Sequence, residues 1–412
     1  MKSDLNILIL STKVPWPAKD GGSLGTFVYS RSLAFVGNSV TVACLNTNKH
    51  YSDLNKFPSD VKSIANWEAV DINTDISILG ALKNLLFETV PYHVTRFYSS
   101  NFEEKLEELF SNNEFDIVQL EIVYLSQYIP LIRKLSPHTK IVLRAPNLEY
   151  EIWQRNAQGE KNIFKKLYKN FTAKRNFDYE KKCAKNNIWD GLITVTKRDS
   201  NAYKKFNSQM KTHVAPFGIR LIENQNKTEN INTSSFKTHK VGYLGAMDWL
   251  PNQEGVEWFL ENVWNKILKE APDAKFHLAG RKMPQKYFEY ASDSVIVLGE
   301  VDDAFKFMKS CDVMVVPLKS GSGMRVKIIE AMSQSVALVA SETALEGIDA
   351  KDGQDIFVTG DDDVELFAVR TVELLQNKEL ALEMGKSAKE FVKENFDEDE
   401  IAKRMTEFYL SL

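Results

Sequence analysis

Residues 313–332 read VMVVPLKSGSGMRVKIIEAM, and this stretch decides the fold class. A short apolar run passes into a turn of glycine and serine, and a segment of helical period then begins near Gly323. An apolar run without polar alternation is typical of a strand buried on both faces of a parallel sheet. The stretch therefore predicts one strand–turn–helix unit of an α/β domain.

The same alternation extends along the whole chain. Further short apolar runs are expected strands, and with 313–316 they cover 6–10, 40–45, 117–120, 141–143, 192–195, 241–244, 276–279, 295–298 and 337–340. Longer segments of helical period separate them, which is the pattern of βαβ units in doubly wound sheets. The fold class is therefore α/β, built from Rossmann-like units.

The length of 412 residues exceeds the usual size of one hydrophobic core, so two domains are expected. Residues 222–240 are polar, rich in Asn, Thr and Ser, and without periodicity, and a new strand begins at Val241. We place a first domain at 1–217 and a second at 218–395. The segment from about 380 to 412 reads as two amphipathic helices.

Composition excludes several classes of protein. A net charge of -4 gives no basic footprint for nucleic acid. Cys44, Cys183 and Cys311 lie far apart, which argues against a disulfide framework and a zinc site. The apolar run 7–10 is too short for a signal peptide, and no stretch reaches the roughly 20 apolar residues of a membrane span. We therefore expect a cytoplasmic protein without a nucleic-acid partner.

The turn within 313–332 has the features of a diphosphate site. Gly321 and Gly323 let a ligand approach the backbone, and the first N–H groups of the helix favour an anion. Arg325 and Lys327 add two cations at the same end, where they oppose the helix dipole unless an anion binds. An ordinary strand–helix turn with solvated charges is the alternative, and this stretch alone leaves both open.

Two other glycine loops occupy corresponding positions. In PWPAKDGGS (15–23), Gly21 and Gly22 open a helix at the carboxyl end of the first strand, where ligands bind in doubly wound sheets. Their spacing lacks GxGxxG, so a dinucleotide fingerprint is not supported, and a structural turn is the alternative. In GYLGAMDWLPN (242–252), Gly245 opens the second domain in the same way. We expect the two loops to face each other across a cleft.

Three segments of the second half resemble the retaining GT-B glycosyltransferases of the group 1 family: MDWLPNQEGVEW (247–258), HLAGR (277–281) and GSGMRVKIIEAM (321–332). PWPAKDGG (15–22) and LRAPNLEYEIW (143–153) are similar to bacterial members linked to polysaccharide synthesis. The resemblance covers nearly the whole chain and is strongest in the second half. It implies a C-terminal nucleotide-sugar domain, an N-terminal acceptor domain, and a last helix within 396–412 that crosses back onto the first domain.

The resemblance also assigns residues to roles. Glu330 matches the glutamate that holds the donor ribose hydroxyls, and Arg325 and Lys327 would stabilise charge on the leaving nucleotide. The expected donor-binding residues are Gly21, Gly22, Gly245, Leu298, Gly321, Ser322, Gly323, Met324 and Glu330. The expected catalytic residues are Arg325, Lys327, Asn147 and Glu149.

Two positions depart from the family pattern. Ser322 stands where a first glutamate usually precedes Glu330, and Pro146 stands where a histidine near the donor sugar is usual. Proline has no polar side chain and no N–H, so Asn147 or Glu149 would have to replace that histidine. The departures keep open an alternative function, a catalytically impaired nucleotide-sugar-binding or assembly protein with the same fold. An epimerase would need acidic and histidine groups that do not stand out.

The reaction expected from the resemblance needs no cofactor. Retaining transfer without an enzymatic nucleophile depends on positioning and charge stabilisation, and Arg325, Lys327 and a helix N-terminus can balance the diphosphate without a metal. The acidic runs 302–303 and 361–363 are expected to be helix-start carboxylates, which the helix dipole favours. The expected partners are a nucleotide-sugar donor and a glycan or lipid-linked acceptor.

Residues 161–185 form a basic segment of helical period. Ile163, Phe164, Leu167, Tyr168 and Phe171 recur on one face, and lysines surround them. A basic amphipathic helix can rest on an anionic membrane, which would place the protein at the inner face of the plasma membrane, close to a lipid-linked acceptor. In the alternative interpretation, the apolar face packs on its own domain and the lysines are solvated.

Overall fold

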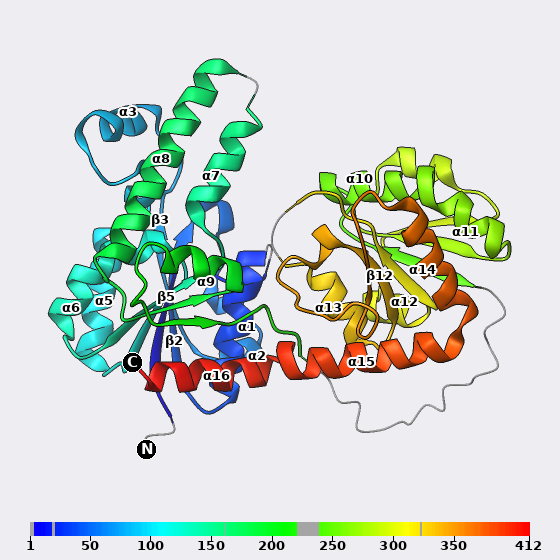
Figure 1. Cartoon of the computed structure of the whole chain (residues 1–412). Coiled ribbons are helices and arrows are strands. Elements are labelled where there is room, and N and C mark those ends of the chain that lie inside the picture. The colour runs from blue at the N-terminus through cyan, green and yellow to red at the C-terminus, as the bar shows by residue number, and fades with distance from the viewer. Residues whose placement is uncertain (1–3, 19–20, 161, 221–238, 322–323) are drawn as a thin grey trace. The chain divides into compact units, whose positions relative to one another are not determined.

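The structure, a computed structural model, describes residues 4–18, 21–160, 162–220, 239–321 and 324–412. The chain divides into two compact units (Figure 1). The first is Met1–Gly218 together with Glu398–Leu412, and the second is Ile219–Asp397. The units therefore divide one residue after the expected boundary at 217 and two residues after that at 395. The last helix belongs to the first unit.

The first unit is built on a parallel sheet of seven strands in the order β3-β2-β1-β4-β5-β6-β7. The strands are β1 (Asn6–Ser11), β2 (Ser39–Thr47), β3 (Asn66–Ile72), β4 (Ile117–Leu120), β5 (Lys140–Ala145), β6 (Gly191–Thr194) and β7 (Thr212–Val214). Ile7 of β1 pairs with Val40 of β2 on one side and with Ile117 of β4 on the other. The strand order reverses between β1 and β4, which makes the sheet doubly wound.

Helices cover both faces of this sheet. The helices of the first unit are α1 (Gly21–Phe35), α2 (Ser59–Lys62), α3 (Ile78–Phe87), α4 (Tyr92–Thr95), α5 (Ser100–Asn112), α6 (Ile129–Leu135), α7 (Glu149–Gln158), α8 (Ile163–Lys185), α9 (Lys197–Lys204) and α16 (Glu398–Leu410). Leu8 and Leu10 of β1 enter one hydrophobic core, and Ile7 and Ile9 enter the core on the other face. Because successive side chains of a strand point to opposite faces, the continuous apolar run fills both cores.

Helix α16 is part of the core that covers the α1 face of the sheet. Its apolar side chains, including Met405 and Tyr409, are buried there. At its start the Glu398 carboxylate pairs with Arg31 of α1 at 2.6 Å. Further along, the Thr406 hydroxyl accepts a hydrogen bond of 2.9 Å from the Asn38 amide. The amphipathic period predicted for the last segment thus corresponds to a helix that closes the first unit.

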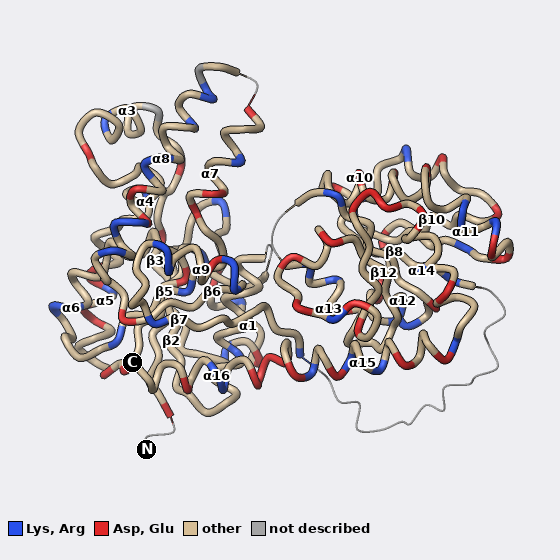
Figure 2. The backbone as a smooth tube through the Cα atoms, viewed as in Figure 1, with Lys and Arg blue, Asp and Glu red and all other residues tan. Residues whose placement is uncertain are grey.

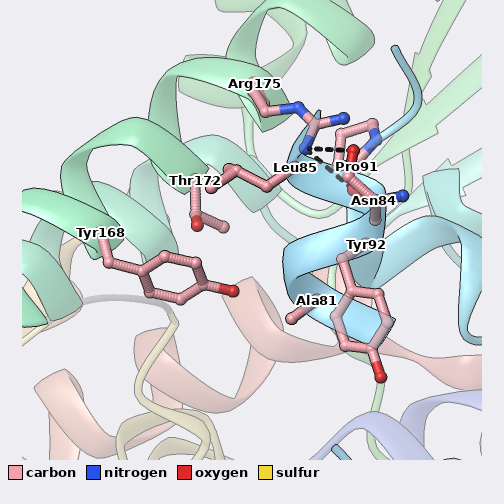
Figure 3. A pocket seen from close by; sticks show the side chains of 8 residues that line it. All are labelled: Ala81, Asn84, Leu85, Pro91, Tyr92, Tyr168, Thr172 and Arg175. Carbon is pink, nitrogen blue, oxygen red and sulfur yellow. Dashed lines mark hydrogen bonds between the residues drawn. The ribbon is translucent and has the colours of Figure 1, made fainter. Parts of the chain in front are cut away.

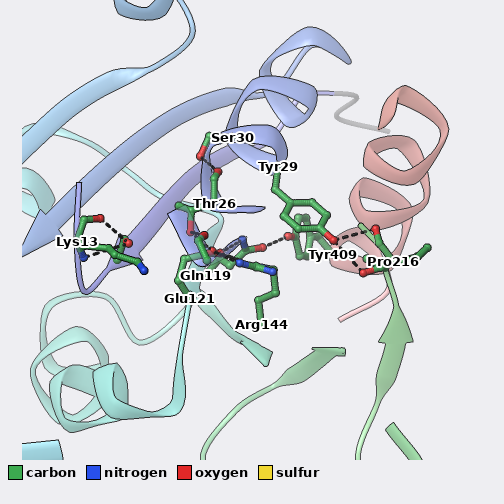
Figure 4. Close-up of polar contacts among 12 residues, drawn as sticks. Lys13, Thr26, Tyr29, Ser30, Gln119, Glu121, Arg144, Pro216 and Tyr409 are labelled. Carbon is green, nitrogen blue, oxygen red and sulfur yellow. Dashed lines mark hydrogen bonds and ion pairs between the residues drawn. The ribbon is translucent and has the colours of Figure 1, made fainter. Parts of the chain in front are cut away.

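A buried polar network lies at the switch point of the first sheet (Figure 4). Arg144 of β5 forms an ion pair with Glu121, which follows β4, and both side chains are almost fully buried. The Glu121 carboxylate also accepts hydrogen bonds from Thr26 at 2.5 Å and from Gln119 at 2.6 Å. Gln119 in turn accepts the Tyr409 hydroxyl of α16. The network therefore links β4, β5, α1 and α16 through one charged pair.

The second unit contains a parallel sheet of six strands in the order β10-β9-β8-β11-β12-β13. The strands are β8 (Lys240–Leu244), β9 (Lys275–Ala279), β10 (Val295–Gly299), β11 (Val313–Val316), β12 (Ala337–Ser341) and β13 (Phe357–Thr359). The helices are α10 (Leu250–Trp258), α11 (Trp264–Glu270), α12 (Ala304–Lys309), α13 (Val326–Ser333), α14 (Val364–Gln376) and α15 (Lys378–Phe396). Val313 of β11 pairs with Val241 of β8 and with Ala337 of β12, and the order reverses between β8 and β11.

Every strand expected from the sequence is present, and three more are found. β7 and β13 have only three residues each, too few for a recognisable run. β3 lies at the edge of its sheet and reads NWEAVDI, with charged residues among half-buried ones. Charged residues are usual on an edge strand, and they hide it from a search for apolar runs. Within the described ranges, no helix is long and apolar enough to cross a membrane.

Candidate functional site

The loops after β8 and β11 flank the switch point of the second sheet. In doubly wound folds, ligands bind outside the carboxyl ends of the strands at this point. Gly321, in the loop after β11, has a φ of +107°, and a Cβ there would lie 2.9 Å from the Trp249 ring and 3.0 Å from Arg325 Nη2. Both the backbone conformation and the close approach require glycine. The two predicted loops therefore meet through Trp249, Gly321 and Arg325.

Arg325 is the N-cap residue of α13 and is buried. The helix thus begins at Val326, three residues later than the sequence indicated. The Arg325 guanidinium centre lies 5.4 Å from the centroid of the Trp249 ring. Burial lowers the pKa of Arg325, and a cation at the positive end of a helix is unfavourable by itself. An anion bound at this helix start would relieve both costs.

Lys327 lies in the first turn of the same helix, with its ammonium group held inside the unit. Its Nζ donates to the Tyr243 hydroxyl at 3.0 Å and to Asn252 Oδ1 at 2.9 Å. Burial, with a further contribution from Arg325, lowers the pKa of Lys327 to about 7. A Cβ at Gly245 would lie 2.9 Å from the Tyr243 hydroxyl and 3.0 Å from the Asn252 amide nitrogen. Gly245 thus leaves room for the groups that hold Lys327.

Glu330 follows Lys327 by about one helical turn and is half-buried. Burial raises the pKa of its carboxyl group. Among the residues that the structure describes, the Glu330 carboxylate forms no ion pair and no side-chain hydrogen bond. A half-buried carboxylate in this state retains its capacity to accept hydrogen bonds from a ligand. Met324, which precedes Arg325, is also half-buried, and Ser322 and Gly323 lie outside the described residues.

Leu298 lies near the carboxyl end of β10, on the same side of the sheet as the two loops, and 43% of its surface is exposed. The neighbouring strand ends are packed backbone against backbone. The Gly280 N–H donates to the Gly299 carbonyl at 2.7 Å, and a Cβ at Gly280 would lie 1.8 Å from the Gly245 carbonyl oxygen. Leu298 therefore lies at the carboxyl ends of the strands, as does the loop that contains Gly245.

In the first unit, the predicted site residues have different surroundings. Gly21 and Gly22 are exposed at the start of α1, and Asn147 is exposed in the turn after β5. Glu149, the first residue of α7, is instead buried and accepts a hydrogen bond of 2.7 Å from the Tyr124 hydroxyl. Burial raises the pKa of Glu149. The structure therefore gives an exposed side chain to Asn147 and an internal hydrogen bond to Glu149.

A cluster around Glu149 was missed in the sequence. The N–H groups of Glu149 and Tyr150 donate to the side-chain carboxyl group of Glu180 on α8, at 3.4 and 3.1 Å. Burial raises the pKa of Glu180 to about 8. His93 stacks on Trp153 of α7 with ring centroids 3.8 Å apart, and burial lowers its pKa to about 4. His93 is therefore neutral near pH 7, and Glu180 anchors the start of α7.

Sequence reasoning also missed three side chains of the second unit: Tyr243, Trp249 and Asn252. All three belong to the segment 242–252 that was singled out for its glycines. A buried tyrosine within a strand, such as Tyr243 in β8, is expected to belong to the core, and only the fold brings it to Lys327. One residue of each acidic run lies at a helix start, as expected: Asp303 accepts from the Lys306 N–H at 2.9 Å and Asp363 from the Leu366 N–H at 3.0 Å. Asp361 and Asp362 instead interact with Thr343 and Lys319.

Comparison with protein families identifies the second unit. Residues 238–377 match the family model described as Glycosyl transferases group 1. The second unit is a group 1 glycosyltransferase domain. The matched range of this group 1 domain includes Gly245, Leu298, Gly321, Arg325, Lys327 and Glu330. It therefore contains both loops at the switch point.

Two curated proteins are similar in sequence. The chain is 23% identical over 411 residues to an uncharacterised 44.6 kDa protein from the cps region of Klebsiella pneumoniae, covering 96% of this chain and 97% of that protein. It is 30% identical over 112 residues to an uncharacterised glycosyltransferase of Methanocaldococcus jannaschii, covering 26% of this chain and 28% of that protein. The first similarity extends beyond the group 1 domain to almost the whole chain.

Solved structures share the fold over the full length. Sucrose-phosphate synthase from Thermosynechococcus elongatus aligns with a TM-score of 0.65 and 18% identity, covering 98% of both chains. Anabaena Alr3699/HepE, solved in complex with UDP, aligns with a TM-score of 0.65 and 12% identity, covering 99% of this chain and 100% of that chain. These likenesses show that the chain has the GT-B fold.

Proposed function

We propose that this protein is a retaining glycosyltransferase that moves a sugar from a nucleotide-sugar donor to a glycan or lipid-linked acceptor. The observation that carries the proposal is the pair of cations at the start of α13, Arg325 and Lys327, within the group 1 domain. Burial and the helix dipole disfavour a positive charge on each of these side chains, and a bound diphosphate would offset both effects. Glu330, about one turn further, offers a carboxylate for the ribose hydroxyls.

The donor is expected to be a nucleoside diphosphate sugar. The loop at Gly321 would admit the diphosphate to the start of α13, and Leu298 would lie near the base. The complexes of Anabaena Alr3699/HepE with UDP and with UDP-glucose support a donor of this chemical class. Gly21 and Gly22 at the start of α1 are proposed to contribute from the first unit.

The proposed chemistry relies on charge stabilisation. The bond between the anomeric carbon and the diphosphate oxygen breaks, and a new bond forms to the acceptor oxygen on the same face of the sugar. The acceptor proton passes to the departing phosphate. Arg325 and Lys327 would stabilise the charge that develops on the diphosphate, which is the contribution that a metal ion makes in other transferases. The reaction is therefore proposed to proceed without a metal.

The cps-region relative from Klebsiella pneumoniae supports a role in the synthesis of cell-surface polysaccharide.

A second candidate function is a nucleotide-sugar-binding or assembly protein that does not transfer the sugar. Two observations favour it: Pro146 offers no polar group after β5, and the Glu149 carboxylate is buried against Tyr124. Under both candidate functions, the group 1 domain is proposed to bind the nucleotide sugar.

Turnover of the donor distinguishes these candidates. The protein should release nucleotide slowly from one nucleotide sugar even when water is the acceptor, and early proton NMR spectra should show the released sugar with the anomeric configuration of the donor. EDTA should not change the rate, and Lys327→Met should reduce it. Release of the opposite anomer first would contradict retention, and loss of activity in EDTA would contradict metal independence. Donor binding without any release would favour the second candidate.

A further inference from the structure

Exposed apolar side chains gather in two segments of the first unit. Among the described residues, twenty-one large hydrophobic side chains are exposed, and nine of them belong to α3, its preceding residues and the start of α8. These nine are Ile76, Leu79, Leu82, Leu86, Phe87, Ile163, Leu167, Tyr168 and Phe171. Single exposed hydrophobic residues are normal on a protein surface, but a concentrated group marks an interaction site.

Helix α3 presents its apolar residues on one face. Leu79, Leu82 and Leu86 follow a spacing of three and four residues, and they are 80%, 50% and 72% exposed. Residues at this spacing lie on the same side of a helix. Asn84, on the opposite side, is buried against the rest of the unit. The outward face of α3 is therefore apolar, although the helix is well anchored.

The first half of α8 also carries exposed apolar side chains, with lysines between them. Ile163 and Leu167 are 67% and 62% exposed, and Tyr168 and Phe171 are also exposed. Burial begins only at Thr172 and Ala173. Ile163 and Leu167 are therefore mostly uncovered, whereas Tyr168 and Phe171 are partly covered by the first unit. The alternative in which the apolar face of the segment 161–185 packs on its own domain thus holds only in part.

Arg175 links the two helices. Its guanidinium group, on α8, donates to Asn84 Oδ1 of α3 at 2.8 Å (Figure 3). It also donates to the Val90 carbonyl at 2.9 Å. Tyr168 and Thr172 of α8 line the same small pocket as Ala81 and Leu85 of α3. Figure 1 shows both helices at one end of the first unit. We call the nine exposed side chains the α3/α8 surface.

Exposed lysines outnumber exposed carboxylates around this surface. Lys83 of α3 is exposed, and so are Lys165, Lys166 and Lys174 of α8, while the exposed Asp75 and Glu88 flank α3. Figure 2 shows Lys and Arg positions in blue along α8. Between residues 162 and 175 the sequence contains no Asp or Glu. Lys169 is an exception among the lysines, since it pairs with Glu160 at 2.7 Å. The remaining ammonium groups can attract anionic headgroups while their aliphatic stems follow the apolar surface.

We propose that the α3/α8 surface docks on a lipid bilayer that carries anionic lipids. An apolar face rimmed by lysines is the arrangement by which interfacial helices insert their side chains between headgroups. A second copy of the chain fits less well, because a twofold contact would bring the same lysines together and like charges repel. The proposal is independent of the donor chemistry proposed above, and so is its test.

Vesicle co-sedimentation of the full chain tests the proposal. The wild type should sediment with vesicles of phosphatidylcholine and phosphatidylglycerol, and about tenfold less with phosphatidylcholine alone or at high salt. Leu79→Glu/Leu86→Glu and Lys165→Glu/Lys166→Glu should each reduce sedimentation with the anionic vesicles by about tenfold or more. The matched control is Leu382→Glu, on α15 of the second unit, where the leucine is 43% exposed; it should behave as the wild type.

Three outcomes would overturn the proposal. Failure of the wild type to sediment with anionic vesicles would exclude docking, and an equal loss in Leu382→Glu would show that any added charge has the same effect. A concentration-dependent dimer in analytical ultracentrifugation that Leu79→Glu/Leu86→Glu dissolves, without vesicle binding, would assign the surface to a second copy. Each variant alters exposed side chains, so unchanged circular dichroism and melting midpoints should confirm that the fold is intact. Donor binding, measured in parallel, should be the same in all variants.

Discussion

Lys327→Met is expected to weaken binding of the nucleotide sugar by about 10- to 100-fold, because hydrogen bonds to charged groups contribute about 1.5–3 kcal/mol. The ammonium group of Lys327 already has two protein partners, Tyr243 and Asn252, so it is held in place before the diphosphate arrives. Methionine keeps the length of the side chain but cannot carry the charge. Isothermal titration calorimetry of the wild type and the variant measures the difference.

The same lysine should make donor binding pH-dependent. Burial lowers the pKa of Lys327 to about 7, so about half of the molecules carry the neutral amine at pH 7. A bound diphosphate favours the ammonium form and raises this pKa, so binding should take up about half a proton at pH 7. Affinity should therefore fall as the pH rises above 7, by at most about tenfold per unit. A nucleotide sugar is the right probe because its phosphodiester groups do not titrate in this range.

Calorimetry in buffers with different ionisation enthalpies measures the proton uptake directly. The wild type should show uptake that Lys327→Met lacks. Lys319→Met is the matched control, because Lys319 lies in the loop after β11 and forms an ion pair with Asp362. It should retain the uptake. Equal proton uptake in the wild type and in Lys327→Met would contradict the assignment of Lys327 to the diphosphate.

The second large effect concerns stability. Arg144→Met is expected to lower the free energy of unfolding of the first unit by about 3–5 kcal/mol, because it leaves the Glu121 carboxylate buried without its charged partner. Burial alone would raise the pKa of Glu121, but Arg144 and the hydrogen bonds outweigh it, so the pKa is lowered and the carboxylate is charged at neutral pH. The double variant Arg144→Met/Glu121→Gln should lose less than Arg144→Met alone, since no charge is then stranded.

Differential scanning calorimetry is suited to this comparison, because the two units can unfold as separate transitions. The control is Lys56→Met, which removes an exposed ion pair with Asp53 at 3.7 Å in the same unit. Exposed pairs contribute about 0–1 kcal/mol, so this change should be small. A loss of similar size in Lys56→Met and Arg144→Met would contradict the importance assigned to the buried pair.

The apolar runs predicted the central strands of both sheets because strands buried on both faces must be apolar throughout. β1 with Ile7 to Leu10 and β11 with Val313 to Val316 are examples. The same signal disappears where a strand is short or lies at an edge, as in β3 and β13. Helical period likewise identified the apolar face of α8, but period alone does not tell whether the chain covers that face.

The sequence also predicted some residues of the candidate site and not others. The glycines, the cations and Glu330 around α13 could be predicted because they are adjacent in the sequence. The partners of Lys327 could not be, because Tyr243 and Asn252 reach it only through the pairing of β8 with β11. Glu149 was expected near the reacting groups, whereas the fold buries its carboxylate against Tyr124. Spacing in the sequence shows which residues are neighbours along the chain. Which of their side chains are accessible to a ligand depends on burial, and burial follows from the fold.

The group 1 domain is proposed to bind a nucleotide-sugar donor through Glu330 and the start of α13. Thermal melting of the full chain against UDP-, GDP-, ADP- and dTDP-sugars tests this binding. One nucleotide class should raise the midpoint of the wild type, with a stabilisation of about 2.7 kcal/mol at a hundredfold excess over the dissociation constant. Glu330→Ala should lose most of this shift, and Glu342→Ala, at an exposed position of the same unit, should keep it. No shift with any nucleotide sugar, or an undiminished shift in Glu330→Ala, would contradict the claim.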